Sequence, residues 1–312
     1  MVNEGSSVEL SGAGSSDEEG DPMTFAWDLD DDGSFESPGV AVTFSRVDGP
    51  ADHTVTLRVC DPYSCAEDST TVRVNNVAPT VTLVPGAATN FSGQIHQITA
   101  TFTDPGLIDT HTTTINWDDG AGDESVTVTQ GTGSGSLSGS HQYLAARIYN
   151  IIVTVTDNDD DSGSAQQVKT VIRLPVFIDI KPGSDRNSIN PSSKGVFPVG
   201  VFSGTYADVV FDASTIVGSS LVFEETGIAH GDSHVEDLDG TGSLDSVSHY
   251  RTQATSLTDS SVEGCLTGAT GGGIEFAGCD SVRLVPPGHS TAGGRGGPPP
   301  GTVGGRAHGT PE

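Results

Sequence analysis

The stretch HTVTLRVCDPYSCAEDSTTVRV, residues 53–74, decides the fold. Apolar and polar residues alternate over 55–59 and again over 70–74, which is the pattern of two half-buried β-strands. The turn residues DPYS stand between them, so the segment predicts a β-hairpin. Similar short runs, for example at 7–10 and 151–155, recur between Gly, Asp, Asn and Ser clusters, whereas helical patterns are scarce. We therefore predict an all-β protein.

The hairpin belongs to a unit that occurs twice. TFAWDLDDDG (24–33) precedes the first hairpin, and TTINWDDG (113–120) precedes the second, YNIIVTVTDNDDDSGSAQQVKTVI (149–172). In both copies a tryptophan strand ends in an acidic glycine turn before a long hairpin, and strands at this spacing indicate β-sandwiches. The junction VNNVAPTVTL contains the proline that starts a new strand. We predict two sandwiches, over residues 1–77 and 78–174.

These motifs resemble the PKD domain, an immunoglobulin-like module of cell-surface and secreted proteins with a WDFGDG-type turn. VNEGSSVELSGAGSSDEEGDPMTFAWDL (2–29) is similar to its first half, and SHQYLAARIYNIIVTVTDNDDDSGS (140–164) is similar to its H-x-Y…Y-x-V-x-L-x-V-x-D ending. The resemblance covers residues 2–173 and implies tandem seven-stranded sandwiches that act as spacers or adhesion modules, without catalysis. The first copy lacks the usual leading strand, so we expect it to be N-terminally truncated.

A third region resembles a small β-rich domain that recurs near the C-termini of bacterial secreted multidomain proteins. The matching motifs are FIDIKPGSDRNSINPSSKGVFPVGVF (177–202), HVEDLDGTGSLDSVSHYRTQ (234–253) and DSVRLV (280–285). We predict a compact β-rich domain over 175–286. Residues 287–312 are nearly all Gly, Pro and small polar residues without apolar periodicity, which predicts a disordered tail.

The chain is strongly acidic. Its 312 residues include 13 Lys and Arg against 42 Asp and Glu, a formal net charge of −29, so nucleic acid and anionic membrane surfaces meet a repulsive field. Cations are the expected partners, and calcium is the first candidate. No apolar run reaches the ~20 residues that span a bilayer, and residues 1–20 are polar. We predict an extracellular or cell-surface location, with any export signal outside this sequence.

The four cysteines form two local pairs, Cys60 with Cys65 and Cys265 with Cys279. This spacing fits two short-range disulfides better than one shared metal site, and disulfides favour an oxidising, extracytoplasmic compartment. The chain-entropy relation gives about 2 kcal/mol for the first loop and about 3 kcal/mol for the second. Reduced, buried thiols are the alternative.

Two stretches share one arrangement of oxygen-bearing residues, DLDDDGSFE (28–36) and DLDGTGSLD (237–245). Side chains at positions 1, 3, 5 and 9 and the carbonyl at position 7 converge around a glycine at position 6, as in calcium loops. Neither loop has the bidentate Glu at position 12 of an EF-hand, so we expect structural calcium with an affinity of about 10⁻⁴–10⁻³ M. The predicted ligands are Asp28, Asp30, Asp32, Ser34 and Glu36 in the first loop, and Asp237, Asp239, Thr241, Ser243 and Asp245 in the second.

Each loop also has a plainer interpretation, an acidic turn that only serves its own backbone. The second loop is tighter, and we expect Leu238 and Leu244 to anchor it inward. In the first loop we expect Trp27 and its apolar neighbours to fill the core while the carboxylates face outward. The related turn of the second sandwich, residues 116–120, has no carboxylate at its first position, which predicts a solvated turn.

The sequence contains no G-x-S-x-G, HExxH or P-loop motif, so we predict no enzyme. HGDSHVE (230–236) carries two imidazoles and two carboxylates, but four ligands on one flat strand do not close a zinc tetrahedron. The preferred function is a calcium-stabilised structural or adhesion segment. One alternative is a substrate-binding accessory module of a secreted enzyme, for polysaccharide or protein, for which Tyr63, Tyr143 and Tyr206 are the few aromatic candidates; another is a filament subunit whose first sandwich accepts a strand from another copy.

Overall fold

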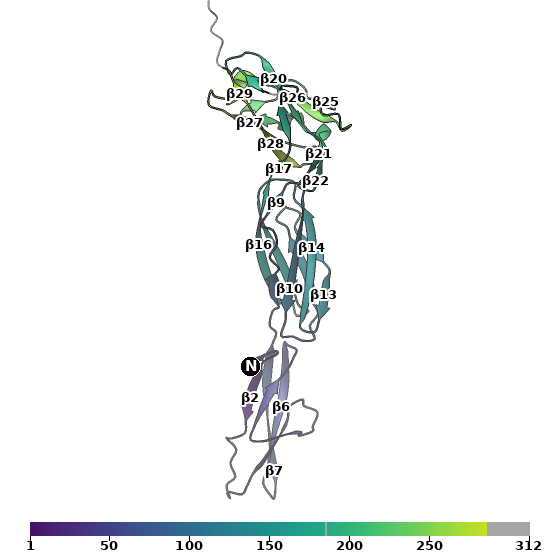
Figure 1. Ribbon diagram of the computed structural model, residues 1–312. Helices are drawn as coiled ribbons and strands as arrows, with labels where there is room; N and C mark the ends of the chain where they lie inside the picture. The colour runs from purple at the N-terminus through teal and green to yellow at the C-terminus, as the bar shows by residue number, and fades with distance from the viewer. Residues whose placement is uncertain (185, 286–312) are drawn as a thin grey trace, which may run out of the picture.

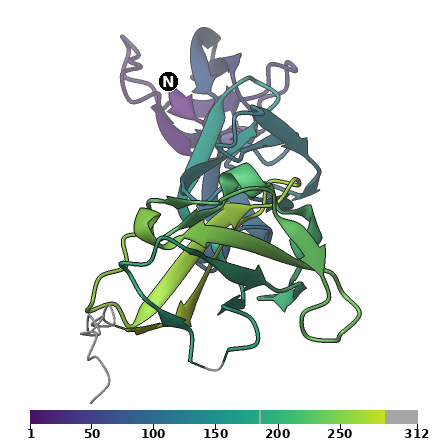
Figure 2. The same ribbon diagram turned by 90° about the horizontal axis from the view of Figure 1, so that it is seen from above.

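The computed structural model describes residues 1–184 and 186–285, and the predicted tail at 287–312 lies outside the described residues. The predicted all-β class is confirmed: the described residues form strands and three short 3-10 helices. Three β-units follow one another along one long axis (Figure 1). In the view turned by 90°, the third unit lies in front of the other two (Figure 2). Each unit has its own buried apolar cluster.

The first unit is a small sandwich that contains the predicted hairpin as β6 and β7. Its five-stranded sheet has the order β1-β7-β6-β3-β4, and β2 pairs with β5. Phe44 and Val55 pack between the two layers in a cluster of five buried residues. The strands are β1 (Val2–Asn3), β2 (Ser7–Ser11), β3 (Thr24–Asp28), β4 (Ser37–Pro38), β5 (Ala41–Ser45), β6 (Ala51–Cys60) and β7 (Cys65–Asn75).

The second unit has the same plan with more strands. Its sheets have the orders β13-β14-β10-β8 and β12-β11-β15-β16-β9, and twelve buried residues, among them Trp117 and Tyr143, lie between them. Here β8 pairs with β10; the first unit has no described strand in that place. The strands are β8 (Thr80–Leu83), β9 (Thr89–Phe91), β10 (Ile95–Thr103), β11 (Thr112–Asn116), β12 (Asp123–Val126), β13 (Val128–Gly131), β14 (Ser134–Gln142), β15 (Ile148–Thr156) and β16 (Ser162–Ile172).

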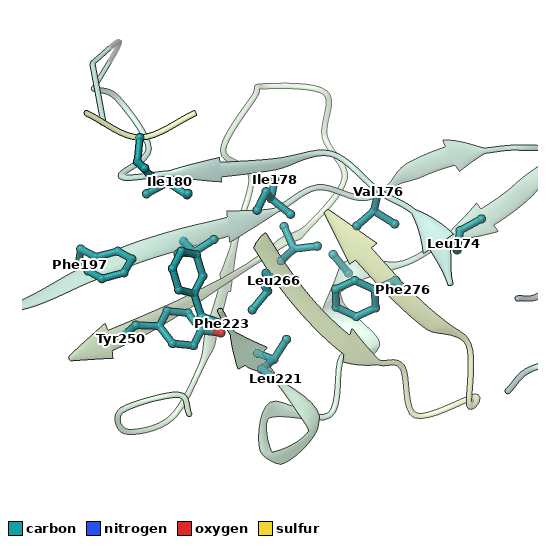
Figure 3. Close-up of a cluster of buried hydrophobic side chains, with 14 of the residues drawn as sticks. Leu174, Val176, Ile178, Ile180, Phe197, Leu221, Phe223, Tyr250, Leu266 and Phe276 are labelled. Atoms are coloured by element: carbon teal, nitrogen blue, oxygen red, sulfur yellow. The ribbon is translucent and has the colours of Figure 1, made fainter. Parts of the chain in front are cut away.

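The third unit has the largest buried cluster, eighteen residues, and Figure 3 shows Phe197, Phe223 and Tyr250 together within it. Its sheets are β17-β28-β27-β23-β24, β18-β20-β26-β25, β19-β29 and β21-β22. The elements are β17 (Leu174–Pro175), β18 (Ile178–Ile180), β19 (Ser188–Ile189), β20 (Val196–Val201), β21 (Gly204–Tyr206), β22 (Val209–Phe211), η1 (Ala213–Thr215), η2 (Gly218–Ser220), β23 (Val222–Phe223), β24 (Gly227–Ile228), β25 (His234–Glu236), β26 (Asp245–Arg251), η3 (Thr252–Ala254), β27 (Glu263–Ala269), β28 (Glu275–Ser281) and β29 (Arg283–Leu284).

Both predicted disulfides are confirmed. Cys60 and Cys65 face each other across the β6–β7 hairpin, with Cα atoms 4.0 Å apart. Cys265 and Cys279 do the same across β27 and β28, with Cα atoms 4.1 Å apart. All four cysteines are therefore paired, and none is a free thiol. Each bond staples the two strands of one antiparallel pair.

His96 in β10 makes the second unit sensitive to acid. The residue is 3% exposed, and its Nε2 has no hydrogen-bond partner within the described residues. Burial lowers its pKa from 6.5 to about 4, and the charges of Lys169 and His141 act in the same direction. The unfolded chain takes up a proton on this histidine near pH 6.5, and the folded chain does so only near pH 4. This difference in proton binding therefore costs the folded state nothing above pH 6.5, and the folded state loses stability relative to the unfolded state as the pH falls from 6.5 to 4.

We expect the contribution of His96 to the free energy of unfolding to fall by about 2–3 kcal/mol between pH 6.5 and 4, since each pKa unit corresponds to ~1.4 kcal/mol. Asp109, whose pKa burial raises to about 7, contributes with the opposite sign over the same range, so the effect of His96 is measured as the difference between the parent and His96→Leu. Urea denaturation of both proteins across that range gives the two slopes, and the parent should lose stability relative to the variant as the pH falls. Identical slopes in the two proteins would show that His96 does not contribute.

Candidate metal centres

The first acidic loop folds around the side chain of Asp28, the last residue of β3. Its Oδ1 accepts the backbone N–H groups of Asp30 (3.2 Å) and Asp31 (2.7 Å), and its Oδ2 accepts that of Gly33 (2.9 Å). Asp28 is consequently only 3% exposed. The prediction that it faces outward with the other carboxylates is wrong, because the turn wraps donors around it where the strand alternation ends. Trp27 does lie buried, as predicted.

The second loop uses its first aspartate in the same way. Asp237 Oδ1 accepts the N–H of Gly240 at 2.8 Å, and Oδ2 accepts that of Gly242 at 3.0 Å. In both loops the first carboxylate therefore receives N–H groups from the residues three and five positions later. This shared hydrogen-bond pattern shows that the two stretches, two hundred residues apart, form one type of turn.

The two loops differ at position 9. Glu36 is exposed, whereas Asp245 is completely buried at the start of β26, where it accepts the N–H groups of Ser203 and Leu238, both at 2.9 Å. Leu238 also packs against Gly200, as predicted for an anchor. The expectation for Leu244 is wrong, because its side chain is 50% exposed. The second loop is thus anchored by the buried carboxylate of Asp245 and by Leu238, and not by Leu244.

The carboxylates of each loop lie close enough to share one ion. Oxygens of Asp28, Asp30, Asp32 and Glu36 all lie within 4.8 Å of one another, and so do those of Asp237, Asp239 and Asp245. Two oxygens bound to one calcium ion at 2.3–2.6 Å are at most about 5 Å apart. Ser34, Thr241 and Ser243 are exposed in the same turns, and their role as ligands stays a prediction.

Like charges strain the first loop electrostatically. Burial raises the pKa of Asp30 above its ordinary value, and the charges of Asp32, Glu36 and Asp28 add to this shift. Burial also opposes ionisation of Asp28, but the backbone N–H groups around it outweigh that effect and lower its pKa. A cation near Asp30 would relieve the repulsion without removing any of these hydrogen bonds.

In the turn at 116–120, residues 118–120 are exposed, as predicted, but the turn also contacts neighbouring strands. Asn116 Oδ1 accepts the N–H of Asp118 at 2.9 Å. Asp118 Oδ2 accepts the N–H of Asn150 in β15 at 2.9 Å, and Asp119 Oδ2 lies 3.3 Å from His141 Nε2 in β14.

In HGDSHVE, His234 Nε2 lies 3.5 Å from Glu236 Oε1, and Arg251 Nη2 lies 3.3 Å from His230 Nε2. These two contacts tie up part of the donor set that a metal at this strand would need.

A third group of carboxylates lies between the first two sandwiches and was not predicted. Oxygens of Glu4, Asp104 and Asp109 lie within 4.8 Å of one another, and all three residues are buried. Asp48, Asp109 and Asp159 form a second group, in which only Asp109 is buried. The local sequence gives only a weak signal, an Asp just after the strand that ends at Thr103. Glu4 precedes that Asp by one hundred residues, so the sequence does not reveal that they meet.

Burial is costly for these junction carboxylates. It raises the pKa of Asp109 to about 7, and the charges of Glu4 and Asp104 add to the shift. Burial also raises the pKa of Glu4, although hydrogen bonds from Val77 and Gly49 oppose it. The site therefore favours whatever neutralises it, a proton or a metal ion.

Comparison with known proteins identifies the first sandwich. Residues 1–74 match the PKD domain family, and no curated protein matches the chain. Within residues 1–184 and 186–285, no helix has the length and apolar character needed to cross a membrane. The match falls on the segment that contains the acidic tryptophan turn and the hairpin.

Several solved structures are weakly similar. The PKD domain of an M14-like peptidase from Thermoplasmatales archaeon SCGC AB-540-F20 is 21% identical, with a TM-score of 0.26, and the match covers 31% of this chain and 94% of that one. The mixed-linkage glucan locus protein SGBP-B of Bacteroides ovatus, solved with a mixed-linkage heptasaccharide, is 14% identical, with a TM-score of 0.20, and the match covers 91% of this chain and 65% of that one. Invasin, a bacterial integrin-binding protein, is 12% identical, with a TM-score of 0.35, and the match covers 89% of this chain and 56% of that one.

The present chain thus spans 65% of the length of SGBP-B, and similarity at this level identifies no partner. The resemblance of the second unit to PKD domains rests on its own sequence motifs. The resemblance of the third unit to a different, small β-rich domain rests on the three segments quoted above. The chain carries tandem immunoglobulin-like sandwiches, and the first of them matches the PKD domain family over residues 1–74.

Proposed function

We propose that this chain is a non-catalytic segment of an extracellular or cell-surface protein, in which rigid β-units hold a distance and calcium stabilises the acidic loops. PKD and immunoglobulin-like domains are generally non-catalytic modules, and the first unit is of this kind. The observation that carries the proposal is the end-to-end arrangement of three separately packed units (Figure 1). The two disulfides support an oxidising location.

The connection between the second and third units supports a spacer role, because only one residue separates their strands. β16 ends at Ile172 and β17 begins at Leu174. Phe91 of the second unit packs against the buried cluster of the third. Hydrogen bonds also cross, among them those from Gln94 Nε2 to the carbonyl of Ala207 (2.6 Å) and from the N–H of Glu275 to Ser92 Oγ (2.9 Å). These contacts beside a short connection restrict the relative motion that two linked domains otherwise have.

Calcium is expected to raise the melting temperature of the protein. At ten times the dissociation constant, each occupied site stabilises the folded state by about 1.4 kcal/mol. Scanning calorimetry in calcium and in EDTA measures the shift, and elemental analysis of dialysed protein counts the bound ions. The double variant Asp30→Asn/Asp239→Asn should lose the part that the loops contribute. No shift together with no bound calcium would contradict the calcium part of the proposal.

The polysaccharide-binding alternative gains little support. It needs aromatic rings on the surface, and Tyr63 is indeed 86% exposed. Tyr143, however, is 2% exposed, and its hydroxyl donates to the carbonyl of Trp117 at 2.8 Å inside the second core. Tyr206 is half-buried. The three tyrosines therefore do not form one sugar-stacking platform.

One observation favours a second candidate function, a filament subunit. The outer edge of β2 has no partner among the described strands, whereas the corresponding β10 pairs with β8. An open strand edge accepts a strand from another chain. Light scattering at rising protein concentration tests this, and a strictly monomeric species at the highest concentration would exclude the filament.

A further inference from the structure

The N-terminal strand lies at the end of the first sandwich that faces the second (Figure 1), and it brings Glu4 into the junction. Glu4 is 1% exposed. Its Oε1 accepts the N–H of Val77 in the linker, and its Oε2 accepts that of Gly49, both at 2.8 Å. One carboxylate therefore ties together the N-terminal segment, the loop after β5 and the connection to the second sandwich.

The second sandwich meets it with the loop at 104–109. The N–H of Leu107 donates across the junction to the carbonyl of Val47 at 3.0 Å. Asp104 is held in place within this loop, because its Oδ1 accepts the N–H of Gly106 at 2.8 Å and its Oδ2 lies 2.8 Å from His111 Nε2. Glu4 and Asp104 are thus fixed in direction, and each carboxylate oxygen keeps a further lone pair.

Asp109 is the unexplained member of the group. It is 3% exposed, and neither of its carboxylate oxygens has a hydrogen-bond partner within the described residues. A Cβ added at Gly106 would lie 2.0 Å from Asp109 Oδ2, so the glycine makes room for this carboxylate. Asp109 belongs to both carboxylate groups of the junction. A buried carboxylate without partners is costly, and such a group needs its own explanation.

No basic side chain supplies that explanation. In the described part of the chain, Glu4, Asp48, Asp109 and Asp159 form no ion pair with lysine or arginine. The linker adds another orphan oxygen: Asn76 donates to Asp157 Oδ2 at 2.9 Å, while its own Oδ1 is buried without a partner in the same region. Several acceptors converge here, and the only basic group paired with them in the described part of the chain is the imidazole of His111, on Asp104.

We propose that a divalent cation of the calcium class binds at this junction and fastens the first sandwich to the second. Its ligands come from both sandwiches: Glu4 from the first, and Asp104 and Asp109 from the second, with oxygens within 4.8 Å of one another, while Asp48 and Asp159 form a separate group with Asp109. This oxygen-only donor set, spread over two loops and the linker, suits calcium with its 6–8 ligands better than magnesium, which demands a small octahedron and keeps several waters. The site is separate from the two acidic loops, so either proposal can fail without the other.

The test uses the full chain with both loops disabled by Asp30→Asn/Asp239→Asn, so that the remaining calcium binding reports the junction. Isothermal titration with calcium chloride at pH 7.5 and elemental analysis after dialysis give the stoichiometry. Hydrogen exchange at the amides of Val77 and Gly49 reports the junction directly. We expect residual binding of calcium, with at least tenfold slower exchange at these amides, and tenfold weaker binding of magnesium.

Adding Asp109→Asn to that background should abolish both effects while leaving the protein folded, because the neutral amide removes a buried charge. A melting temperature in EDTA at or above that of the parent verifies folding. If this variant does not fold, Glu4→Gln removes charge from the opposite side of the junction and should have the same effect on binding. The proposal is overturned if the loop-disabled parent binds no calcium, or if Asp109→Asn and Glu4→Gln bind it as well as the parent does.

Discussion

Replacing Asp245 by alanine is expected to lower the free energy of unfolding of the third unit by about 4 kcal/mol. The carboxylate is completely buried and accepts the N–H groups of Ser203 and Leu238. Its removal leaves two half-buried donors without their acceptor, each at a cost of up to about 1–3 kcal/mol, and leaves a void at a fully buried position. Scanning calorimetry should show the third transition at a lower temperature, together with loss of any calcium response of the second loop.

The matched control is the same change at the same position of the other loop. Glu36 is exposed, so Glu36→Ala should change the stability of the first unit by no more than about 0.5 kcal/mol. The comparison separates a carboxylate that supports the fold from one that only faces solvent. Equally small losses in the two variants would show that Asp245 does not hold its loop.

Phe223→Ala is expected to cost about 3–5 kcal/mol, the usual range for removing a buried phenylalanine. Phe223 is fully buried, with its ring 5.3 Å from those of Phe197 and Tyr250 (Figure 3). Gly264 stands directly against the ring, where an added Cβ would lie 2.5 Å from Cζ. Gly264 has no side chain that could fill the void left by the ring. In a denaturant titration monitored by hydrogen exchange, the third unit of the variant should therefore unfold at a lower denaturant concentration than that of the parent.

Phe177→Ala is the control for that variant. Phe177 belongs to the same unit, and its ring lies 5.1 Å from that of Phe202, but the side chain is 61% exposed. We expect a loss of at most about 1 kcal/mol. Because the first sandwich has a separate core, neither substitution should alter exchange in β6 and β7. A shift there would show that the units unfold as one cooperative body.

The strands and the two disulfides could be predicted because their signals are local. Alternation over 55–59 and 70–74 specifies two strands, and Cys60 and Cys65 lie on either side of their turn. The ligand spacing of the two loops is also local, and the structure places those carboxylates together. In such cases the residues that interact are a few positions apart, so the chain itself fixes their distance.

What could not be predicted depends on contacts between distant residues or on the exact path of a turn. Asp28 is buried because the N–H groups that follow it fold back onto its side chain, and an alternating pattern contains no information on that. The junction site needs Glu4 beside Asp109, which depends on how two separate sandwiches dock. In an acidic chain each such residue looks like one more solvated surface group.

The first and last strands of the first sandwich also determine how it responds to pulling. β1 pairs in parallel with β7. Tension enters this sandwich near β1 and leaves through β7, so it drags the two paired strands in opposite directions along their length. The hydrogen bonds between them then bear the load together in shear instead of opening one after another. A tether built in this way should yield abruptly at high force, a behaviour that suits a module exposed to flow or to contact between cells.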